Sequence, residues 1–172
     1  MSRKKLIRGL VSFALAAIIV YGLPYAQGWL NGTPLAPPPP GWFRVVEAFD
    51  GDTVGVDMNG VVEKVRLIGV DTPETHKPNS PKQCYGDVAS GLTKSRLLGK
   101  NVRLEADPTN DNRDRYNRLL RYVYAEDGTL WNERLISEGA GFAYILFPFT
   151  KKSIFMQAQF DASAAKRGLW LQ

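Results

Sequence analysis

Two short acidic segments carry residue types that could do chemistry in this sequence. Residues 50–52 read DGD and residues 71–74 read DTPE. A hairpin is expected between them, which would bring Asp52, at the start of one strand, close to Asp71, at the end of the next, with Glu74 nearby. Carboxylate and carbonyl oxygens gathered in this way suit a hard cation such as Ca²⁺, because acids placed together without a cation would repel each other. The spacing therefore predicts either a metal site or acids with raised pKa values, although each segment taken alone also fits an ordinary turn.

Two arginines are placed where they could bind a phosphate diester beside such a cation. Arg66 stands five residues before Asp71 on the same expected strand, and Arg118 ends the segment DRYNR at residues 114–118. A guanidinium group can donate two parallel hydrogen bonds to phosphate oxygens and can stabilise charge that develops in a transition state. Taken alone, the first arginine also fits a solvated strand position and the second a solvated polar loop. Together with the acids, the two arginines favour phosphodiester chemistry.

The elements that must position these residues are short strands and helices. Apolar and aromatic runs bounded by turn residues predict strands, and runs with spaced apolar residues that end near a glycine predict helices. Asn59-Gly60 predicts a two-residue hairpin. We expect strands over residues 42–49, 53–58, 61–70, 101–106 and 119–125, and helices over residues 87–98, 130–138 and 153–166. This pattern predicts an α+β, mainly β domain: a small five-stranded barrel of the OB type with about three helices, with a flat α+β sandwich as the alternative.

Composition excludes several classes of protein. The 172 residues include one Cys (Cys84) and one His (His76), which rules out an internal disulfide framework and a Cys/His zinc cluster. The chain has 22 Lys and Arg against 17 Asp and Glu, but four of the basic residues precede residue 9, and the other 18 nearly balance the acids. The net charge of +5 is therefore a weak argument for a broad nucleic-acid-binding face.

The N-terminal part has the features of a targeting segment and a tether. The basic residues precede an uncharged, mainly apolar run over residues 9–26, which is typical of an export signal or a membrane anchor. A Pro-rich stretch over residues 31–41 predicts an extended linker. We expect a signal peptide or membrane anchor over residues 1–30, then the linker, then a globular domain over residues 42–172. That domain would lie outside the cytoplasm, either secreted or anchored to the membrane.

Five motifs in a fixed order resemble a known family. The segments DGDTV, VRLIGVDTPET, CYGDVAS, DRYNRLLRYVY and AAKRGLW are together similar to the staphylococcal nuclease (thermonuclease) family, with near-family spacing. The resemblance covers roughly residues 42–170. It implies a five-stranded OB barrel with three helices.

The resemblance also implies roles for individual residues. These are Asp52, Asp71 and the backbone carbonyl of Thr72 as Ca²⁺ ligands; Glu74 as the general base; Arg66 and Arg118 as the groups that bind the scissile phosphate; and Asp114, Arg115, Tyr116 and Tyr144 beside the bound nucleotide. Asp50 would lie at the edge of the metal site. Where the family has a second pocket tyrosine, this chain has Leu146 or Phe147, so we expect altered substrate affinity there.

The implied function is that of an exported, Ca²⁺-dependent endonuclease that hydrolyses DNA and RNA, leaves 3′-phosphates and acts as a monomer. Hydrolysis of an anionic diester needs charge neutralisation, a positioned water, and donors that tighten in the transition state. The cation, Glu74 and the two arginines would supply these, so His76 is not expected to be the base. The alternative is a non-catalytic OB-fold module that binds nucleic acid, although this chain keeps all of the acids and arginines named above.

Overall fold

The computed structural model describes residues 37–74 and 85–171. The expected signal or anchor segment, most of the Pro-rich linker, His76 and Cys84 lie outside these residues. Among the residues that the structure describes, no helix has the length and apolar character needed to cross a membrane. The helices and strands described below all lie in the region expected to be globular, and residues 37–41 are the end of the expected linker.

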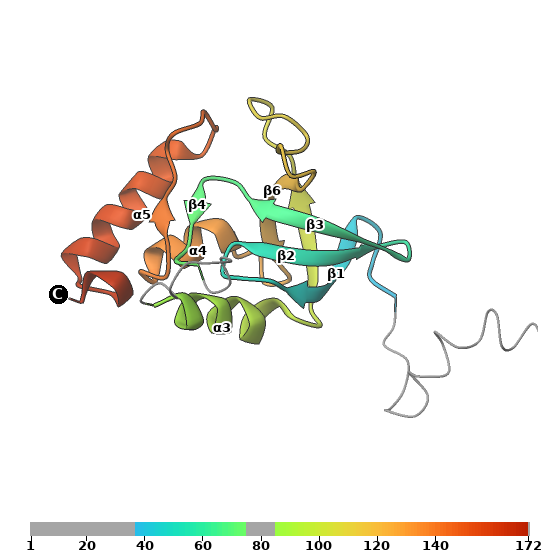
Figure 1. Ribbon diagram of the computed structural model, residues 1–172, viewed down its shortest axis with the longest axis horizontal. Helices are drawn as coiled ribbons and strands as arrows, with labels where there is room; N and C mark the ends of the chain where they lie inside the picture. The colour runs from blue at the N-terminus through green and yellow to red at the C-terminus, as the bar shows by residue number, and fades with distance from the viewer. Residues whose placement is uncertain (1–36, 75–84, 172) are drawn as a thin grey trace, which may run out of the picture. The chain divides into compact units, whose positions relative to one another are not determined.

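Five strands of the described residues close into a barrel (Figure 1). They are β1 (Trp42–Ala48), β2 (Thr53–Met58), β3 (Val61–Leu67), β5 (Asn101–Glu105) and β6 (Leu119–Ala125). Their order around the barrel is β1-β2-β3-β6-β5, and every neighbouring pair is antiparallel except β3 and β6. The predicted five-stranded barrel is confirmed, and its closure rules out the flat sandwich.

The β2–β3 hairpin forms where Asn59-Gly60 predicts it. Both residues have positive φ, 58° for Asn59 and 88° for Gly60, as a two-residue turn matched to the twist of its strands requires. The register of the hairpin pairs Thr53 with Arg66. The start of β2, next to Asp52, therefore lies alongside the end of β3.

Three α-helices accompany the barrel in the described part of the chain. They are α3 (Gly86–Leu97), α4 (Trp131–Ser137) and α5 (Lys152–Ala164), and a 3-10 turn, η1 (Gly168–Trp170), follows α5. Figure 1 shows α3 running along one side of the strands and α5 beyond β4. Buried side chains of the strands and the helices form one core, which includes Val45, Val65, Leu97, Leu135 and Phe155.

The third strand is shorter than predicted. We expected one strand over residues 61–70, but β3 ends earlier, and Val70–Asp71 form a separate strand, β4, that pairs with β7 (Phe142–Ala143). Gly69 makes the break, because its φ is +73° and a Cβ there would lie 2.8 Å from the ring of Phe149. The chain turns at this glycine, so the end of β4 leaves the barrel instead of extending it.

A buried amide holds this turn in place. Asn132 of α4 is fully buried, and its Nδ2 donates to the carbonyls of Ile68 at 2.9 Å and Arg121 at 3.1 Å. Its Oδ1 accepts a hydrogen bond from the backbone N of Val123 at 2.8 Å. One side chain thus fixes the turn after β3 against β6, directly before the segment that carries Asp71 and Glu74.

Candidate active site

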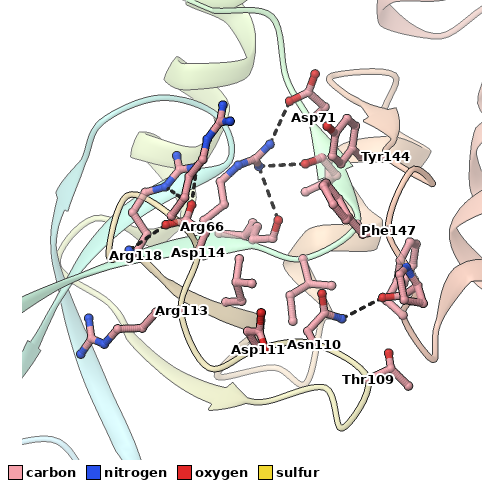
Figure 2. A pocket seen from close by; sticks show the side chains of 18 of the residues that line it. Arg66, Asp71, Thr109, Asn110, Asp111, Arg113, Asp114, Arg118, Tyr144 and Phe147 are labelled. Atoms are coloured by element: carbon pink, nitrogen blue, oxygen red, sulfur yellow. Dashed lines mark hydrogen bonds and ion pairs between the residues drawn. The ribbon is translucent and has the colours of Figure 1, made fainter.

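Arg66 lies between two members of an acidic cluster, which consists of Asp50, Asp52, Asp71 and Glu74. Its Nη1 is 2.8 Å from Oδ2 of Asp52, and its Nη2 is 2.8 Å from Oδ1 of Asp71. Nη1 also donates to the carbonyl of Val70 at 2.8 Å. Figure 2 shows the guanidinium of Arg66 reaching toward Asp71. Two carboxylates from separate segments of the chain therefore share one side-chain cation.

Asp52 is buried, at 5% exposure, and ties the two acidic segments together. Its Oδ2 accepts hydrogen bonds from the backbone N of Thr72 at 2.8 Å and from the Thr72 hydroxyl at 3.1 Å. Its Oδ1 accepts one from the hydroxyl of Thr53 at 3.1 Å. Gly51 permits this approach, because a Cβ there would lie 2.8 Å from the Thr72 side chain. The middle residue of the DGD segment therefore has to be a glycine for steric reasons.

The acidic cluster holds more negative charge than Arg66 offsets. Burial, reinforced by the charge of Asp52, raises the pKa of Asp50 to about 7. Burial also raises the pKa of Asp71 despite the opposing effect of Arg66. The charge of Glu74, which is itself exposed, raises the pKa of Asp71 further. A further cation at this edge would stabilise the ionised forms of these acids.

Asp114 orients Arg118 in the loop between β5 and β6. Its Oδ2 lies 2.7 Å from both Nε and Nη2 of Arg118, and its Oδ1 accepts hydrogen bonds from the backbone N of Tyr116 and of Arg118, each at 2.9 Å. Burial alone would raise the pKa of Asp114, but the hydrogen bonds and charge of Arg118 lower it below its ordinary value. Nη1 of Arg118 also lies 3.5 Å from the hydroxyl of Thr53, the residue after Asp52. The loop thus presents one guanidinium close to the start of β2.

Arg115 and Tyr116 occupy the exposed part of this loop. Nη2 of Arg115 donates to the hydroxyl of Tyr116 at 2.7 Å, and the guanidinium carbon lies 4.8 Å from the centre of the ring. The guanidinium of Arg118 lies on the same ring, at 5.4 Å. An aromatic surface and two cations therefore stand together in the exposed part of this loop.

A cavity of about 710 Å³ opens between this loop, the end of β3 and the segment after β7. The predicted site residues that line it are Arg66, Asp71, Asp114, Arg115, Tyr116, Arg118 and Tyr144. Figure 2 shows Arg66 and Arg118 on one side of this cavity and Phe147 on the other. Asp52, Thr72 and Glu74 do not line the cavity; the first two are buried behind Arg66, and Glu74 is exposed.

The structure distinguishes Leu146 from Phe147. Phe147 lines the cavity, and its ring centre lies 6.0 Å from that of Tyr144. Leu146 does not line it and is 77% exposed. The second aromatic of the pocket is therefore Phe147, which offers a ring face without a hydroxyl.

Sequence reasoning missed two contacts that shape the cavity. Arg113, which lines it, forms a two-bond ion pair with Glu63 of β3, at 2.9 and 3.0 Å. Asn110 also lines it and donates through Nδ2 to the carbonyl of Pro148 at 2.9 Å. Each contact joins residues far apart in the sequence, and neither belongs to a local motif, so only a tertiary structure could reveal them.

The donor set near Arg66 fits a hard cation in kind. Asp52 and Asp71 supply carboxylate oxygens. Thr72 is hydrogen-bonded to Asp52, so its backbone carbonyl is a further oxygen in the same segment, and all of these candidate ligands are oxygens. Among residues 37–74 and 85–171, no group of three or more His, Cys, Asp and Glu side chains is arranged to hold a metal ion. A cation here would therefore need a backbone oxygen and water in addition to two carboxylates, an arrangement that Ca²⁺ accepts.

Comparison with known proteins identifies the family. The family model described as Staphylococcal nuclease homologue matches residues 64–172. The chain is 39% identical over 170 residues to a thermonuclease of Staphylococcus hyicus, an alignment that covers 97% of this chain and 98% of that protein. It is 43% identical over 129 residues to a thermonuclease of Staphylococcus intermedius, with 74% and 75% covered. It is also 44% identical over 125 residues to the endonuclease YncB of Bacillus subtilis, with 72% and 58% covered.

The fold, the site and these similarities agree. The chain belongs to the staphylococcal nuclease family. It is accordingly an enzyme, a hydrolase of the nuclease class.

Proposed function

We propose that this protein is an extracytoplasmic, Ca²⁺-dependent endonuclease that hydrolyses DNA and RNA and leaves 3′-phosphates. The observation that carries the proposal is that Arg66 and Arg118 line one cavity, with Asp71 beside Arg66. Similarity to proteins named thermonuclease and endonuclease supports hydrolysis of nucleic acid. The basic and then apolar residues at the N-terminus support export.

Asp52, Asp71 and the carbonyl of Thr72 would hold the Ca²⁺ ion. When bound, the ion would neutralise charge on the phosphate and on these carboxylates. The raised pKa values of Asp50 and Asp71 are consistent with this role, because they reflect burial and mutual repulsion of acids. Arg66 is the side-chain cation that now lies between Asp52 and Asp71, at 2.8 Å from each.

Arg66 and Arg118 would bind the non-bridging oxygens of the scissile phosphate. Their side chains are 14% and 25% exposed and both line the cavity, so substrate would reach them through it. Each guanidinium is already held in direction by carboxylates, which reduces the reorganisation needed when charge develops on the five-coordinate phosphorus. Both arginines therefore act as positioned donors in the transition state.

Glu74 would act as the general base. Glu74 is exposed, and its charge raises the pKa of Asp71, which supports a position near that acid. It would accept a proton from a water molecule while the water oxygen attacks phosphorus. The bond from phosphorus to the 5′ oxygen breaks, the leaving oxygen takes a proton from solvent, and the phosphate stays on the 3′ oxygen.

The remaining predicted residues would bind the nucleotide next to the reacting phosphate. Asp114 holds the loop, and Arg115 and Tyr116 form its exposed surface. Tyr144 and Phe147 supply aromatic faces across the cavity. Stacking on such faces engages the base and not the 2′ position of the sugar, which is compatible with an enzyme that acts on both DNA and RNA.

Hydrolysis of a labelled single-stranded oligonucleotide by the full chain tests this proposal. We expect cleavage with Ca²⁺, and a loss of about 100-fold or more with a chelator, with Glu74→Gln or with Arg118→Ala. Arg134→Ala is the matched control, because Arg134 also pairs with an acid four residues away, Glu138, but does not line the cavity. Full activity in the presence of chelator and in both site variants would overturn the assigned roles. Binding of the strand without cleavage would favour the non-catalytic module.

A second measurement tests the location. Nuclease activity should appear in the culture medium or on the outer face of the membrane fraction when the full chain is expressed. Activity confined to the cytoplasm would contradict the extracytoplasmic assignment without affecting the catalytic one.

A further inference from the structure

An ion pair joins β3 to the loop that carries Arg118. Nη1 and Nη2 of Arg113 lie 2.9 and 3.0 Å from Oε2 and Oε1 of Glu63, so the guanidinium and the carboxylate meet through two parallel bonds. The hydrogen bonds and charge of Arg113 lower the pKa of Glu63 below its ordinary value. The pair therefore stays charged at neutral pH, although its members are 50 positions apart in the chain.

Arg113 also shapes the turn that precedes Arg118. Its Nη1 donates to the carbonyl of Asn117 at 2.8 Å, and Asn117 has a φ of 63°, in the left-handed region. Arg113 pairs with Leu119 in an antiparallel bridge, so residues 113–119 form a small hairpin. A hairpin of this size is marginally stable by itself and needs contacts from elsewhere to hold one orientation.

Strand β3 connects the two arginines of the proposed active site. Glu63 lies three residues before Arg66 on this strand, and the strand pairs Val65 with Leu119, the residue after Arg118. That pairing fixes the base of the hairpin. The ion pair fixes the other arm of the hairpin, because Arg113, the first residue of the hairpin, is held against Glu63 of β3. Glu63 itself does not line the cavity.

We propose that the Glu63–Arg113 ion pair sets the spacing and direction of Arg66 and Arg118 across the cavity, so that Glu63 and Arg113 are positioning residues for hydrolysis. This inference rests on the proposed function, in which the two arginines bind one phosphate. Misplacement of such a group by about 1 Å can cost roughly 100-fold in rate. Because the arginines keep their charge when the ion pair breaks, attraction of the polyanion remains and the loss falls on kcat.

Glu63→Gln is the decisive variant, tested in the full chain with a labelled single-stranded oligonucleotide and Ca²⁺. We expect kcat to fall about tenfold while KM stays within about threefold of the unmodified protein. A simple charge effect predicts a different result: loss of an acid beside Arg113 would strengthen binding of a polyanion and lower KM without lowering kcat. Unchanged or increased kcat, or a change confined to KM, would overturn the proposal.

Exchange of the two charges provides the second arm of the experiment. Glu63→Arg and Arg113→Glu should each lower kcat, and the double exchange should bring kcat back to within about threefold of the unmodified protein. A double variant that melts normally but shows no recovery would count against the proposal, and if it does not fold, Glu63→Gln decides alone. Glu138→Gln is the matched control, because it breaks the Arg134–Glu138 pair outside the cavity and should leave kcat unchanged.

The two proposals can fail separately. If the unmodified protein does not cleave the strand, or if Arg118→Ala cleaves it normally, the proposed function fails. If cleavage depends on Arg118 but Glu63→Gln has the kcat of the unmodified protein, only the positioning inference fails.

Discussion

The carboxylate of Asp114 closes a turn and directs the guanidinium of Arg118 at the same time. One carboxylate oxygen lies 2.7 Å from two nitrogens of that guanidinium, and the other accepts hydrogen bonds from two backbone amides of the turn, including that of Arg118. Because the same side chain supports the backbone and its own partner, the direction of Arg118 into the cavity depends on an ionised Asp114.

Replacement of Asp114 by Asn should therefore impair catalysis more than folding. The amide can still accept from the backbone, but it loses the charge that holds Arg118, so we expect kcat to fall about tenfold with little change in KM. Steady-state hydrolysis of an oligonucleotide measures this. Asp127→Asn is the matched control, since Asp127 also accepts from a backbone amide two residues on, that of Thr129, and lies outside the cavity. Equal kcat in the two variants would contradict the role of Asp114.

The aromatic side of the cavity predicts a difference between two neighbouring residues. Phe147→Ala should weaken binding of a single strand about tenfold, because it removes a ring on which a base can stack. Leu146→Ala should leave binding unchanged, because Leu146 is more exposed and does not line the cavity. Fluorescence titration of a labelled strand onto each variant, under conditions that prevent cleavage, compares the two. A larger effect at Leu146 would show that the pocket aromatic is not Phe147.

Asp107 holds the start of the long loop to the segment before α5. It is buried, and its carboxylate accepts hydrogen bonds from Tyr122 Oη at 2.6 Å, from the backbone N and hydroxyl of Thr150 at 2.7 and 2.6 Å, and from those of Thr109 at 2.8 and 2.6 Å. Burial alone would raise the pKa of Asp107, but these hydrogen bonds outweigh it and lower the pKa well below its ordinary value. Burial, and next the bond to Asp107, raise the pKa of Tyr122 to about 12, so its hydroxyl remains a donor.

This network predicts an acid-sensitive contribution to stability. Since the pKa of Asp107 is lower in the folded than in the unfolded protein, its contribution is complete above the unfolded value of about 4 and is lost as the pH falls toward the folded value. Asp107→Asn should lower the free energy of unfolding by about 2 kcal/mol at pH 7 and should lose less stability than the unmodified protein between pH 7 and pH 3. Urea unfolding at several pH values measures both quantities. Parallel curves for the two proteins would show that Asp107 does not titrate in this way.

Local sequence determined much of the fold of this protein. Alternating apolar residues and the Asn59-Gly60 turn predicted the strands and the hairpin, because strand period and turn chemistry are properties of a few consecutive residues. The DGD and DTPE segments likewise predicted that Asp52 and Asp71 lie close together, and both contact Arg66.

Tertiary structure alone decided the details that make these residues a site. The break between β3 and β4 falls at Gly69, where a Cβ would meet the ring of Phe149, eighty residues later. The assignment of the pocket to Phe147 depends on which of two neighbouring side chains lines the cavity. The link from Glu63 to Arg113 joins residues 50 apart. Close packing and long-range ion pairs form between residues that only the closed barrel brings into contact, so no window of sequence contains them. The sequence determined which groups are present, and the fold determined their distances and directions.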